Sequence, residues 1–408
     1  MHGTAPNRHE WRTGWPIVLG AVVGSGAGPA LFQNLSSMFV PGMTAELGWS
    51  RSALATASGL GFAGSFAVPL LGRIVDRIGV RPMIAGCMLA LAAAYLGMAA
   101  MPGRLWHYYL LVLVLAMTVP GTSALAYGKL IAARFVEHRG LALGIATSGL
   151  PLTTLLLPIV LAQVIDGFGW RGGFVALAIY SAMIALPVAL IAIRGIAPVD
   201  RPAADVTASS RPIDGVTATA ARRDPRLWRL GLTGFFVNLG TIGFVTQLVP
   251  FGIDRGLTPA EAALLLTAFG ASQVAARITF GALIDRFTPQ RIAATVAMIS
   301  ALGFAFLQVA DLSLVPLSLG VFCAGLMNGA ENDLFPFFAA RLFGLRAYGE
   351  IYGTLIVVAL IGSGAGIIGF GALHDLTGGD AAGLAVASAA LATAGLLFAG
   401  LRDRPAHG

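Results

Sequence analysis

The amino-acid sequence predicts an all-α membrane protein of twelve transmembrane helices, arranged as two pseudo-symmetric bundles of six. Of its 408 residues, 57% are hydrophobic and only 11% are charged, whereas about a quarter of the residues of a soluble domain are charged. Apolar runs of about 20 residues, each long enough to cross a hydrocarbon core about 30 Å thick as a helix, recur along the chain. Motifs that return half a chain later divide these runs into two equivalent sets.

The internal repeat is carried by short motifs. Gly72-Arg-Ile-Val-Asp76-Arg77 returns as Gly281-Ala-Leu-Ile-Asp285-Arg286, and 281 − 72 and 285 − 76 both give 209. The same shift carries Val40-Pro41 onto Val249-Pro250. Several anchors at one offset indicate two homologous halves joined in parallel.

The predicted spans follow in order along the two halves. The first half holds them at residues 16–40, 52–76, 82–101, 107–133, 140–166 and 173–194, and the second at 227–252, 262–284, 290–309, 313–341, 348–374 and 381–401. The domains expected are therefore an N-terminal six-helix bundle (1–194), a cytoplasmic linker (195–226) and a C-terminal six-helix bundle (227–408). The linker is polar, and its four prolines discourage regular structure.

The distribution of arginines predicts the orientation in the membrane. With the N-terminus in the cytoplasm, only Arg51, Arg104, Arg171 and Arg255 lie on the outer side, and most of the remaining arginines lie on the inner side. Such a bias fixes the orientation of spans during insertion. Both termini are expected in the cytoplasm, and the formal charge of +7 requires no nucleic-acid partner.

Several functional classes are disfavoured by what the sequence lacks. The connections between spans are short, and no Gly-x-x-x-x-Gly-Lys-Ser/Thr loop for ATP is present. His107, His138 and His374 fall at span ends, where solvation at the rim explains them, and no His or Cys spacing suggests a metal. We expect no enzyme activity, no cofactor and no metal, and we read Cys87 and Cys323 as packing residues within spans.

Small residues recur inside the spans, as at Gly362, Gly364 and Gly366. In lipid, small residues allow two helix backbones to approach closely. Because this cluster lies in an apolar span, close helix packing is a better explanation than a glycine-rich cofactor loop.

Arg277 is the first candidate for substrate binding. It lies eight residues before Asp285, so a rise of about 1.5 Å per residue places it roughly 12 Å inside the membrane. An intramembrane guanidinium is costly unless it faces a watery cavity or an anion, and its planar fork can grip a carboxylate with two parallel hydrogen bonds. The alternative is a bracing ion pair with an acidic residue of a neighbouring helix.

Glu331 and Asp333 are the acidic residues well inside a predicted span. Burial disfavours the ionised form of a carboxylate, so these residues could exchange protons during transport. A permanent salt bridge to Arg277 or Lys129 is an equally weighted alternative. Two positions apart on a helix, they point about 200° apart, so we expect one of them to face the cavity.

Other polar residues complete the candidate site. Gln33 and Asn34 on the first helix, and Asn238, Thr241 and Gln247 on the seventh, could hydrogen-bond a ligand near the midplane, although helix-to-helix hydrogen bonding is the commoner role of such residues. Gln273 lies one turn from Arg277 and shares its face. Lys129, Tyr127 and Tyr352 are further cavity candidates, and Lys129 could instead extend its ammonium group to the cytoplasmic rim.

The motifs resemble those of the major facilitator superfamily over nearly the whole chain. Gly72-Arg73-Ile74-Val75-Asp76-Arg77-Ile78-Gly79-Val80-Arg81 is similar to that family's signature between its second and third helices. The resemblance implies that Gly72, Asp76, Arg77 and Arg81, with their degraded copy at Asp285 and Arg286, act at a cytoplasmic gate.

Within the superfamily, two segments resemble bacterial members of the monocarboxylate-transporter branch. These are residues 134–149 and the stretch from Asn328-Gly-Ala-Glu331-Asn-Asp333 to Tyr352-Gly353. In that branch the arginine corresponding to Arg277 binds the substrate carboxylate. The sequence departs from animal members at two places, because its first helix carries no charge between Trp15 and Val40 and Gln273 stands where they have an aspartate.

We therefore expect a secondary active transporter that moves a small organic anion, preferably a monocarboxylate, by alternating access with proton symport. The expected location is the bacterial inner membrane, the expected partners are the anion, protons and the lipid bilayer, and the expected state is a monomer. Two alternatives remain, an exporter of drug-like compounds and an anion exchanger of the oxalate/formate type.

Overall fold

The structure is a computed structural model that describes residues 8–61, 80–122, 127, 130–131, 134–135, 138–194, 215–283, 287–309, 313–344 and 346–401. Throughout these ranges the chain is helical apart from short connections and one isolated bridge between Gly215 and Gly344. The prediction of an all-α membrane fold is confirmed.

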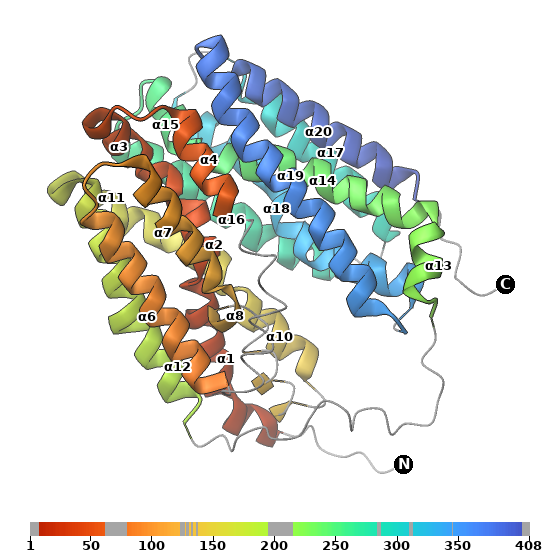
Figure 1. Ribbon diagram of the computed structural model, residues 1–408. Coiled ribbons are helices and arrows are strands. Elements are labelled where there is room, and N and C mark those ends of the chain that lie inside the picture. The colour runs from red at the N-terminus through yellow and green to blue at the C-terminus, as the bar shows by residue number, and fades with distance from the viewer. Residues whose placement is uncertain are drawn as a thin grey trace. The chain divides into compact units, whose positions relative to one another are not determined.

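In the first part of the chain most helices are shorter than the predicted spans, and α11 is longer (Figure 1). They are α1 (Arg8–Gly26), α2 (Pro29–Leu35), α3 (Val40–Leu47), α4 (Arg51–Gly61), α6 (Val80–Ala99), α7 (Leu105–Met117), α8 (Val119–Thr122), α10 (Arg139–Thr147), α11 (Gly149–Ile179) and α12 (Leu186–Ala192). A π-helical stretch, Tyr180–Ala185, joins α11 to α12.

In the second part most helices are long. They are α13 (Ala218–Arg223), α14 (Pro225–Val245), α15 (Leu248–Asp254), α16 (Pro259–Leu283), α17 (Pro289–Phe306), α18 (Leu314–Phe343), α19 (Tyr348–Thr377) and α20 (Ala381–Ala399).

Seven of the described helices are long and apolar enough to cross a membrane, and two bent helix pairs raise that number to nine. One of the seven, Leu141–Ala192, covers most of two predicted spans, 140–166 and 173–194. Gly169 lies between those spans with φ 68°, a left-handed conformation that glycine adopts without the usual steric cost. The predicted spans 52–76 and 107–133 lie only partly within the described residues.

The Val-Pro pairs that reveal the repeat stand at the beginning of short helices. Val40 is the first residue of α3, and Pro250 lies in the first turn of α15. A proline is tolerated in a first turn because the N–H that it lacks would have no partner within the helix. The Val249-Pro250 pair directly follows the break at which α14 and α15 meet at 56°, whereas the 47° bend of the first half lies further before its pair, between Gly26 and Pro29.

The predicted linker is not irregular throughout. Its C-terminal part forms α13, where Thr217 accepts a hydrogen bond from the Ala220 N–H at 3.3 Å and so caps the helix. Asp224 then caps α14 by accepting a bond from Arg226 N at 2.8 Å. The four prolines were expected to discourage regular structure in the linker. Pro225 instead begins α14, because proline is favoured at the first position of a helix.

The chain divides into two compact units. Unit 1 comprises Met1–Gln33, Ala63–Thr154 and Gln163–Ala208, and unit 2 comprises Asn34–Phe62, Leu155–Ala162 and Ser209–Gly408. Residues of the first repeat thus enter unit 2, where α4 packs against α19. The domain boundaries at 194 and 226 stay a prediction.

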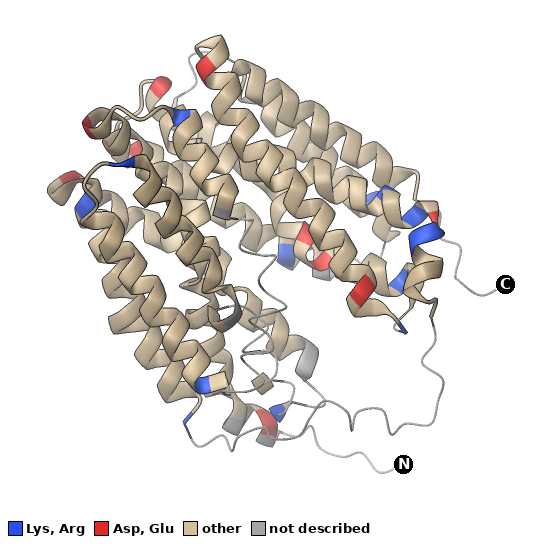
Figure 2. Cartoon of the chain, in the orientation of Figure 1, with Lys and Arg blue, Asp and Glu red and all other residues tan. Residues whose placement is uncertain are grey.

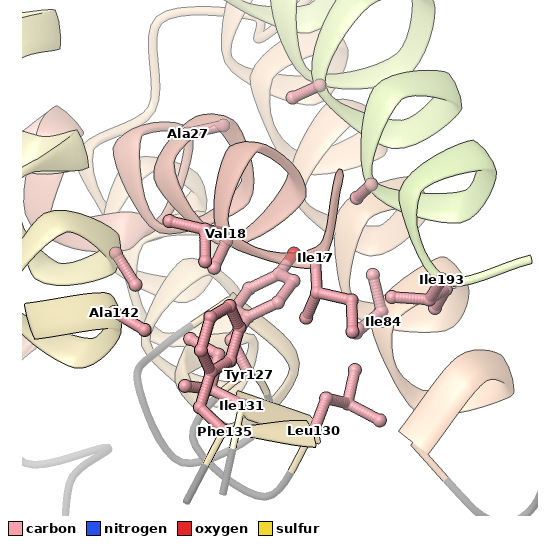
Figure 3. Packing of buried hydrophobic residues seen from close by; sticks show 14 of the residues in the cluster. Ile17, Val18, Ala27, Ile84, Tyr127, Leu130, Ile131, Phe135, Ala142 and Ile193 are labelled. Carbon is pink, nitrogen blue, oxygen red and sulfur yellow. The ribbon is translucent and has the colours of Figure 1, made fainter. Parts of the chain in front are cut away.

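In unit 1, aromatic rings fill the core beneath α1. Tyr127 and Phe135 lie among Ile17, Val18 and Ile84 (Figure 3). The rings approach α1 at two glycines, because a β-carbon at Gly14 would collide with the Phe135 ring and one at Gly24 with the Tyr127 hydroxyl. The two glycines therefore let the rings reach the α1 backbone.

In unit 2, α14, α19 and α20 run side by side, and α16 and α17 pack on α18 (Figure 1). A β-carbon at Gly362 would collide with the carbonyl of Phe235, and one at Gly366 with the carbonyl of Leu239. Close packing of α19 on α14 at these glycines agrees with the interpretation of the cluster as a helix contact.

Candidate functional site

Charged residues part-way along the helices of unit 2 mark the candidate site. Most colour in this unit lies near helix ends, and blue and red residues also occur part-way along α16 and α18 (Figure 2). Arg277 on α16 is half-buried, as are Glu331 and Asp333 on α18. Both carboxylates act electrostatically on the Arg277 guanidinium, and the effect of Asp333 is the larger.

Glu331 is held by an amide. Asn238 Nδ2 on α14 donates to Glu331 Oε2 at 2.9 Å and to the Gly234 carbonyl at 3.0 Å. The Oδ1 atom of the same amide accepts from Ser363 Oγ on α19 at 3.1 Å. One side chain therefore joins α14, α18 and α19, and both the oxygen and the nitrogen of its amide have hydrogen-bond partners.

A second chain of hydrogen bonds runs beside Arg277. Gln273 Nε2 on α16 donates to Asn328 Oδ1 on α18 at 2.7 Å. Asn328 Nδ2 donates to Thr241 Oγ1 on α14 at 3.4 Å, and Thr241 donates to the Val237 carbonyl at 2.8 Å. Gln273, Asn328 and Thr241 are buried, so these bonds offset the cost of removing their polar groups from water.

The structure thus brings together Arg277, Glu331, Asp333 and three of the predicted polar residues, Gln273, Asn238 and Thr241. Tyr352 on α19 belongs with them, because its hydroxyl lies within electrostatic range of Glu331 and Asp333. Its ring stacks on Tyr348 at a centroid distance of 5.6 Å.

Three other predicted ligand residues lie on α2 or at the C-terminal end of α14. Gln33 is half-buried on α2, and Asn34 beside it is buried. Gln247 lies at the break between α14 and α15, and its buried Oε1 has no hydrogen-bond partner among the described residues. An orphaned buried oxygen of this kind calls for a partner such as water or a ligand.

The remaining candidates are the cavity residues Tyr127 and Lys129 and the gate residues. Tyr127 is packed in the core of unit 1, and its hydroxyl has no hydrogen-bond partner in the described part of the chain. Arg81 is exposed at the beginning of α6. Lys129 and the gate residues Gly72, Asp76, Arg77, Asp285 and Arg286 lie outside the described residues.

An ion-pair network that the sequence reasoning missed joins α4 to α15 and α19 within unit 2. Arg51 binds Asp254 through both of its terminal Nη atoms, with Nη1–Oδ2 at 2.7 Å and Nη2–Oδ1 at 2.9 Å. The Nδ1 atom of His374 lies 2.9 Å from Asp380 Oδ1 and 3.5 Å from Arg51 Nη1. We name Arg51, Asp254, His374 and Asp380 the outer network.

His374 therefore has specific partners rather than simple solvation at a span end. One signal could have found the network: Arg51 is one of the few arginines predicted on the outer side, and an arginine at such an exception invites a search for a local acidic partner. Asp254, His374 and Asp380 also have ligand atoms within 4.8 Å of one another, but the Arg51 guanidinium supplies positive charge there, which disfavours a bound cation.

Comparisons with known proteins identify the family. A family model described as Major Facilitator Superfamily matches residues 22–367. Monocarboxylate transporter 13 of Rattus norvegicus is 27% identical over 98% of this chain and 91% of its own length. Monocarboxylate transporter 11 of Homo sapiens is 26% identical over 95% and 83%, and an MFS-type transporter of Gibberella moniliformis is 28% identical over 81% and 77%.

A solved structure supports the fold. The bacterial homolog to the human lysosomal transporter Spinster, in an inward-facing and occupied conformation, matches 100% of both chains with a TM-score of 0.71. Only 16% of the residues are identical, so this similarity concerns the fold alone.

Proposed function

The chain belongs to the Major Facilitator Superfamily, and from this premise we propose that it is a proton-coupled transporter of a small monocarboxylate that works by alternating access. Transport rather than enzymatic catalysis follows from the family and its fold. The monocarboxylate is supported by relatives that are named monocarboxylate transporters. It is supported further by the candidate site itself.

The single observation that carries the proposal is the position of Arg277. It lies within the membrane-crossing part of α16, one turn from Gln273 and within range of two carboxylates. A guanidinium in this position can bind a carboxylate through two parallel hydrogen bonds. Gln273 is held in place through Asn328, so it can present a fixed polar surface beside the bound anion.

The charges of the site support proton coupling. With both carboxylates ionised, Arg277, Glu331 and Asp333 carry one net negative charge, and a bound monocarboxylate would raise it to two. Uncompensated charge in a membrane interior is costly. A proton that binds with the anion removes part of this cost, so anion and proton should travel together.

We assign the exchanged proton to Glu331 rather than to Asp333. The hydrogen-bond partner of Glu331 is a neutral amide, Asn238, whereas Asp333 has the larger electrostatic effect on Arg277. A carboxyl group with a neutral partner can lose or gain its proton without breaking an ion pair. Asp333 then balances the charge of Arg277 while no substrate is bound.

The gates are part of the same proposal. The outer network closes the outer side, because it ties the beginning of α4 to the ends of α15 and α19. The repeated loops at Asp76 and Arg77 and at Asp285 and Arg286 brace the cytoplasmic side, as their similarity to the family signature implies. Alternating access then consists of making one set of contacts while the other set breaks.

Two other kinds of transport remain candidates. Two carboxylates beside one guanidinium leave negative charge in the site, which would also suit an exporter of cationic drug-like compounds. An anion exchanger would use Arg277 in the same way and would move no protons.

Ligand binding to purified protein tests the proposal. A ligand that binds only the folded protein raises the melting temperature, so we expect stabilisation by at least one small monocarboxylate and not by organic amines. Loss of one charge-assisted hydrogen bond of about 1.5 kcal/mol should weaken that binding about tenfold in Arg277→Lys. Arg277→Ala should abolish it.

Arg104→Ala serves as the matched control, because Arg104 is an exposed arginine at the beginning of α7. It should bind the carboxylate as the wild type does. Unchanged carboxylate affinity in both Arg277 variants would refute the assignment, and stabilisation by amines alone would favour the exporter.

A further inference from the structure

A basic pocket lies where α13 and the beginning of α14 meet the end of α20. Its volume is about 580 Å³, and its lining includes Arg222, Arg223, Trp228, Arg229, Leu232 and Leu397. We propose that this basic pocket binds the phosphate headgroup of an anionic phospholipid. The proposal concerns the membrane around the protein and does not depend on which substrate is transported.

Two of the three arginines have donors available for a phosphate. Arg223 is exposed and makes no hydrogen bond or ion pair within the described part of the chain. Arg229 donates from Nη1 to the Gly400 carbonyl at 2.7 Å, but its buried Nε has no partner among the described residues. A buried donor without a partner is unfavourable, and a phosphate oxygen would satisfy it once the Arg229 side chain turns its Nε towards the pocket.

The acidic residues nearby are already engaged. Glu350 pairs with Arg222 at 2.5 Å, and Asp224 pairs with Arg226 at 2.7 Å. The described carboxylates next to the pocket therefore do not neutralise Arg223 and Arg229. The basic pocket is complementary to an anion that comes from outside this part of the chain.

The arginine contacts also hold the pocket in shape. Trp228 Nε1 donates to the Arg222 carbonyl at 2.8 Å, which fixes α13 against the first turn of α14. The Arg222–Glu350 pair ties α13 to the beginning of α19. These two contacts hold α13 in place against α14 and α19, and so fix the helices that carry Arg223 and Arg229.

The apolar side of the pocket indicates a lipid rather than a free phosphate ion. Trp228 is 48% exposed, and Leu232, one turn further along α14, is 47% exposed. Both lie at the beginning of a membrane-crossing helix, where tryptophan is enriched at the lipid–water boundary. An acyl chain can cover Leu232 while its headgroup reaches the arginines, and basic pockets of this kind on the cytoplasmic side suit anionic lipids.

Lipid-dependent melting of the full-length protein in detergent micelles tests the proposal. Dioleoyl-phosphatidylglycerol should raise the melting temperature of the wild type, whereas dioleoyl-phosphatidylcholine and inorganic phosphate should not. At about fivefold per arginine, the double variant Arg223→Gln/Arg229→Gln should bind phosphatidylglycerol about 25-fold more weakly. The matched control Arg12→Gln/Arg194→Gln removes two exposed arginines elsewhere and should respond like the wild type.

Three results would overturn the proposal: equal responses of the wild type to the two lipids, an undiminished phosphatidylglycerol response in the double variant, or equal stabilisation by inorganic phosphate alone. Because Arg229 also holds the end of α20, the double variant could fold poorly. The single variant Arg223→Gln then decides, since Arg223 is exposed and supports no other residue. We expect about fivefold weaker binding, and wild-type affinity would contradict the proposal.

Discussion

At the scale of single residues, the two carboxylates beside Arg277 have different surroundings. Glu331 faces an amide and Asp333 acts mainly on the arginine. If Glu331 carries the proton, its replacement should separate proton movement from substrate movement. A residue that only braced the bundle would not produce this separation.

We predict that Glu331→Gln abolishes uphill uptake driven by an inward proton gradient but retains exchange of labelled for unlabelled substrate. Glutamine still accepts a hydrogen bond from Asn238, so the local structure is kept while the exchangeable proton is lost. Transport by proteoliposomes measures both modes. Asp333→Asn is the comparison variant and should still accumulate substrate. If Glu331→Gln also accumulates substrate, a group other than Glu331 carries the proton.

The charged cap of α14 gives a prediction about stability and pH. Hydrogen bonds from Arg226 hold the pKa of the Asp224 carboxyl below its ordinary value. The folded state therefore binds the proton less readily than the unfolded state. The resulting stabilisation is present above about pH 4, where the carboxyl of an unfolded chain is ionised, and is lost as the pH falls through and below that value.

Melting of Asp224→Asn and Asp224→Ala in detergent separates the cap from the charge. Asparagine also caps helices well, whereas alanine at this position costs about 1 kcal/mol. We expect Asp224→Ala to melt below the wild type at every pH. The difference between the wild type and Asp224→Asn should shrink below about pH 4, and a constant difference would show that the ion pair contributes nothing.

The sequence could predict those residues of the candidate site that are polar and stand within apolar spans. Arg277, Gln273, Asn238 and Thr241 are conspicuous there, and the structure places them in or beside connected networks. Ser363 and Asn328 completed those networks without being selected, because a single serine or asparagine in a helix gives no sign of its partner. The partner depends on helix packing, which local sequence does not specify.

At the scale of helices, the glycines of α19 govern how closely it packs on α14. A β-carbon at Gly362 meets the backbone of Phe235, which cannot move aside cheaply, whereas one at Gly364 has no heavy atom within 4 Å. The two positions belong to the same cluster and differ in their surroundings.

We predict that Gly362→Ala destabilises the protein by about 1–3 kcal/mol, the usual cost of overpacking. Gly364→Ala is the matched control and should be neutral or stabilise by up to about 1 kcal/mol through helix propensity. Thermal melting of the two purified variants measures the difference. Equal melting temperatures would mean that the α14–α19 contact adjusts without strain.

The outer network gives a second prediction about helices. Removing the guanidinium in Arg51→Ala breaks the bidentate pair with Asp254 and the link to His374. Amide hydrogen exchange should then become faster in α4 and at the C-terminal end of α19, while Arg104→Ala, at another predicted outer position, leaves both unchanged. Unaltered exchange in Arg51→Ala would show that other contacts keep these helices together.

The sequence predicted where helices occur better than where they bend or break. Hydropathy marked the spans, but it could not show that the α14–α15 pair bends by 56° or that part of the linker forms α13. Bends follow from proline and glycine in a particular packing environment, and short helices depend on caps such as Thr217. These features are decided by a few hydrogen bonds rather than by average composition.

At the scale of the whole molecule, the two repeats differ in the polar residues that they carry inside the membrane. The 209-residue offset maps Arg277 onto Val68 and Gln273 onto Gly64, so the first repeat is apolar where the second carries its polar side chains. The networks around Arg277 likewise lie within unit 2. Two similar halves suit a rocking mechanism, and the proposed function places substrate and proton binding on residues of the second half.

The sequence could predict the family because the motifs that resemble it are spread over much of the chain. It could not predict that residues 34–62 of the first repeat pack into unit 2, since that depends on contacts such as Arg51 with Asp254 that are distant along the chain. Nor could it name the transported acid, because a guanidinium can bind any carboxylate in the way proposed for Arg277.

The most direct test is carboxylate-dependent proton uptake by proteoliposomes that contain a pH dye. For wild-type protein, addition of a stabilising monocarboxylate should acidify the lumen at a rate that saturates with its concentration. Arg277→Ala should acidify no faster than empty liposomes, and Arg277→Lys should require higher concentrations. Wild-type rates and half-saturation in both variants would contradict the central role of Arg277 in proton-coupled monocarboxylate transport.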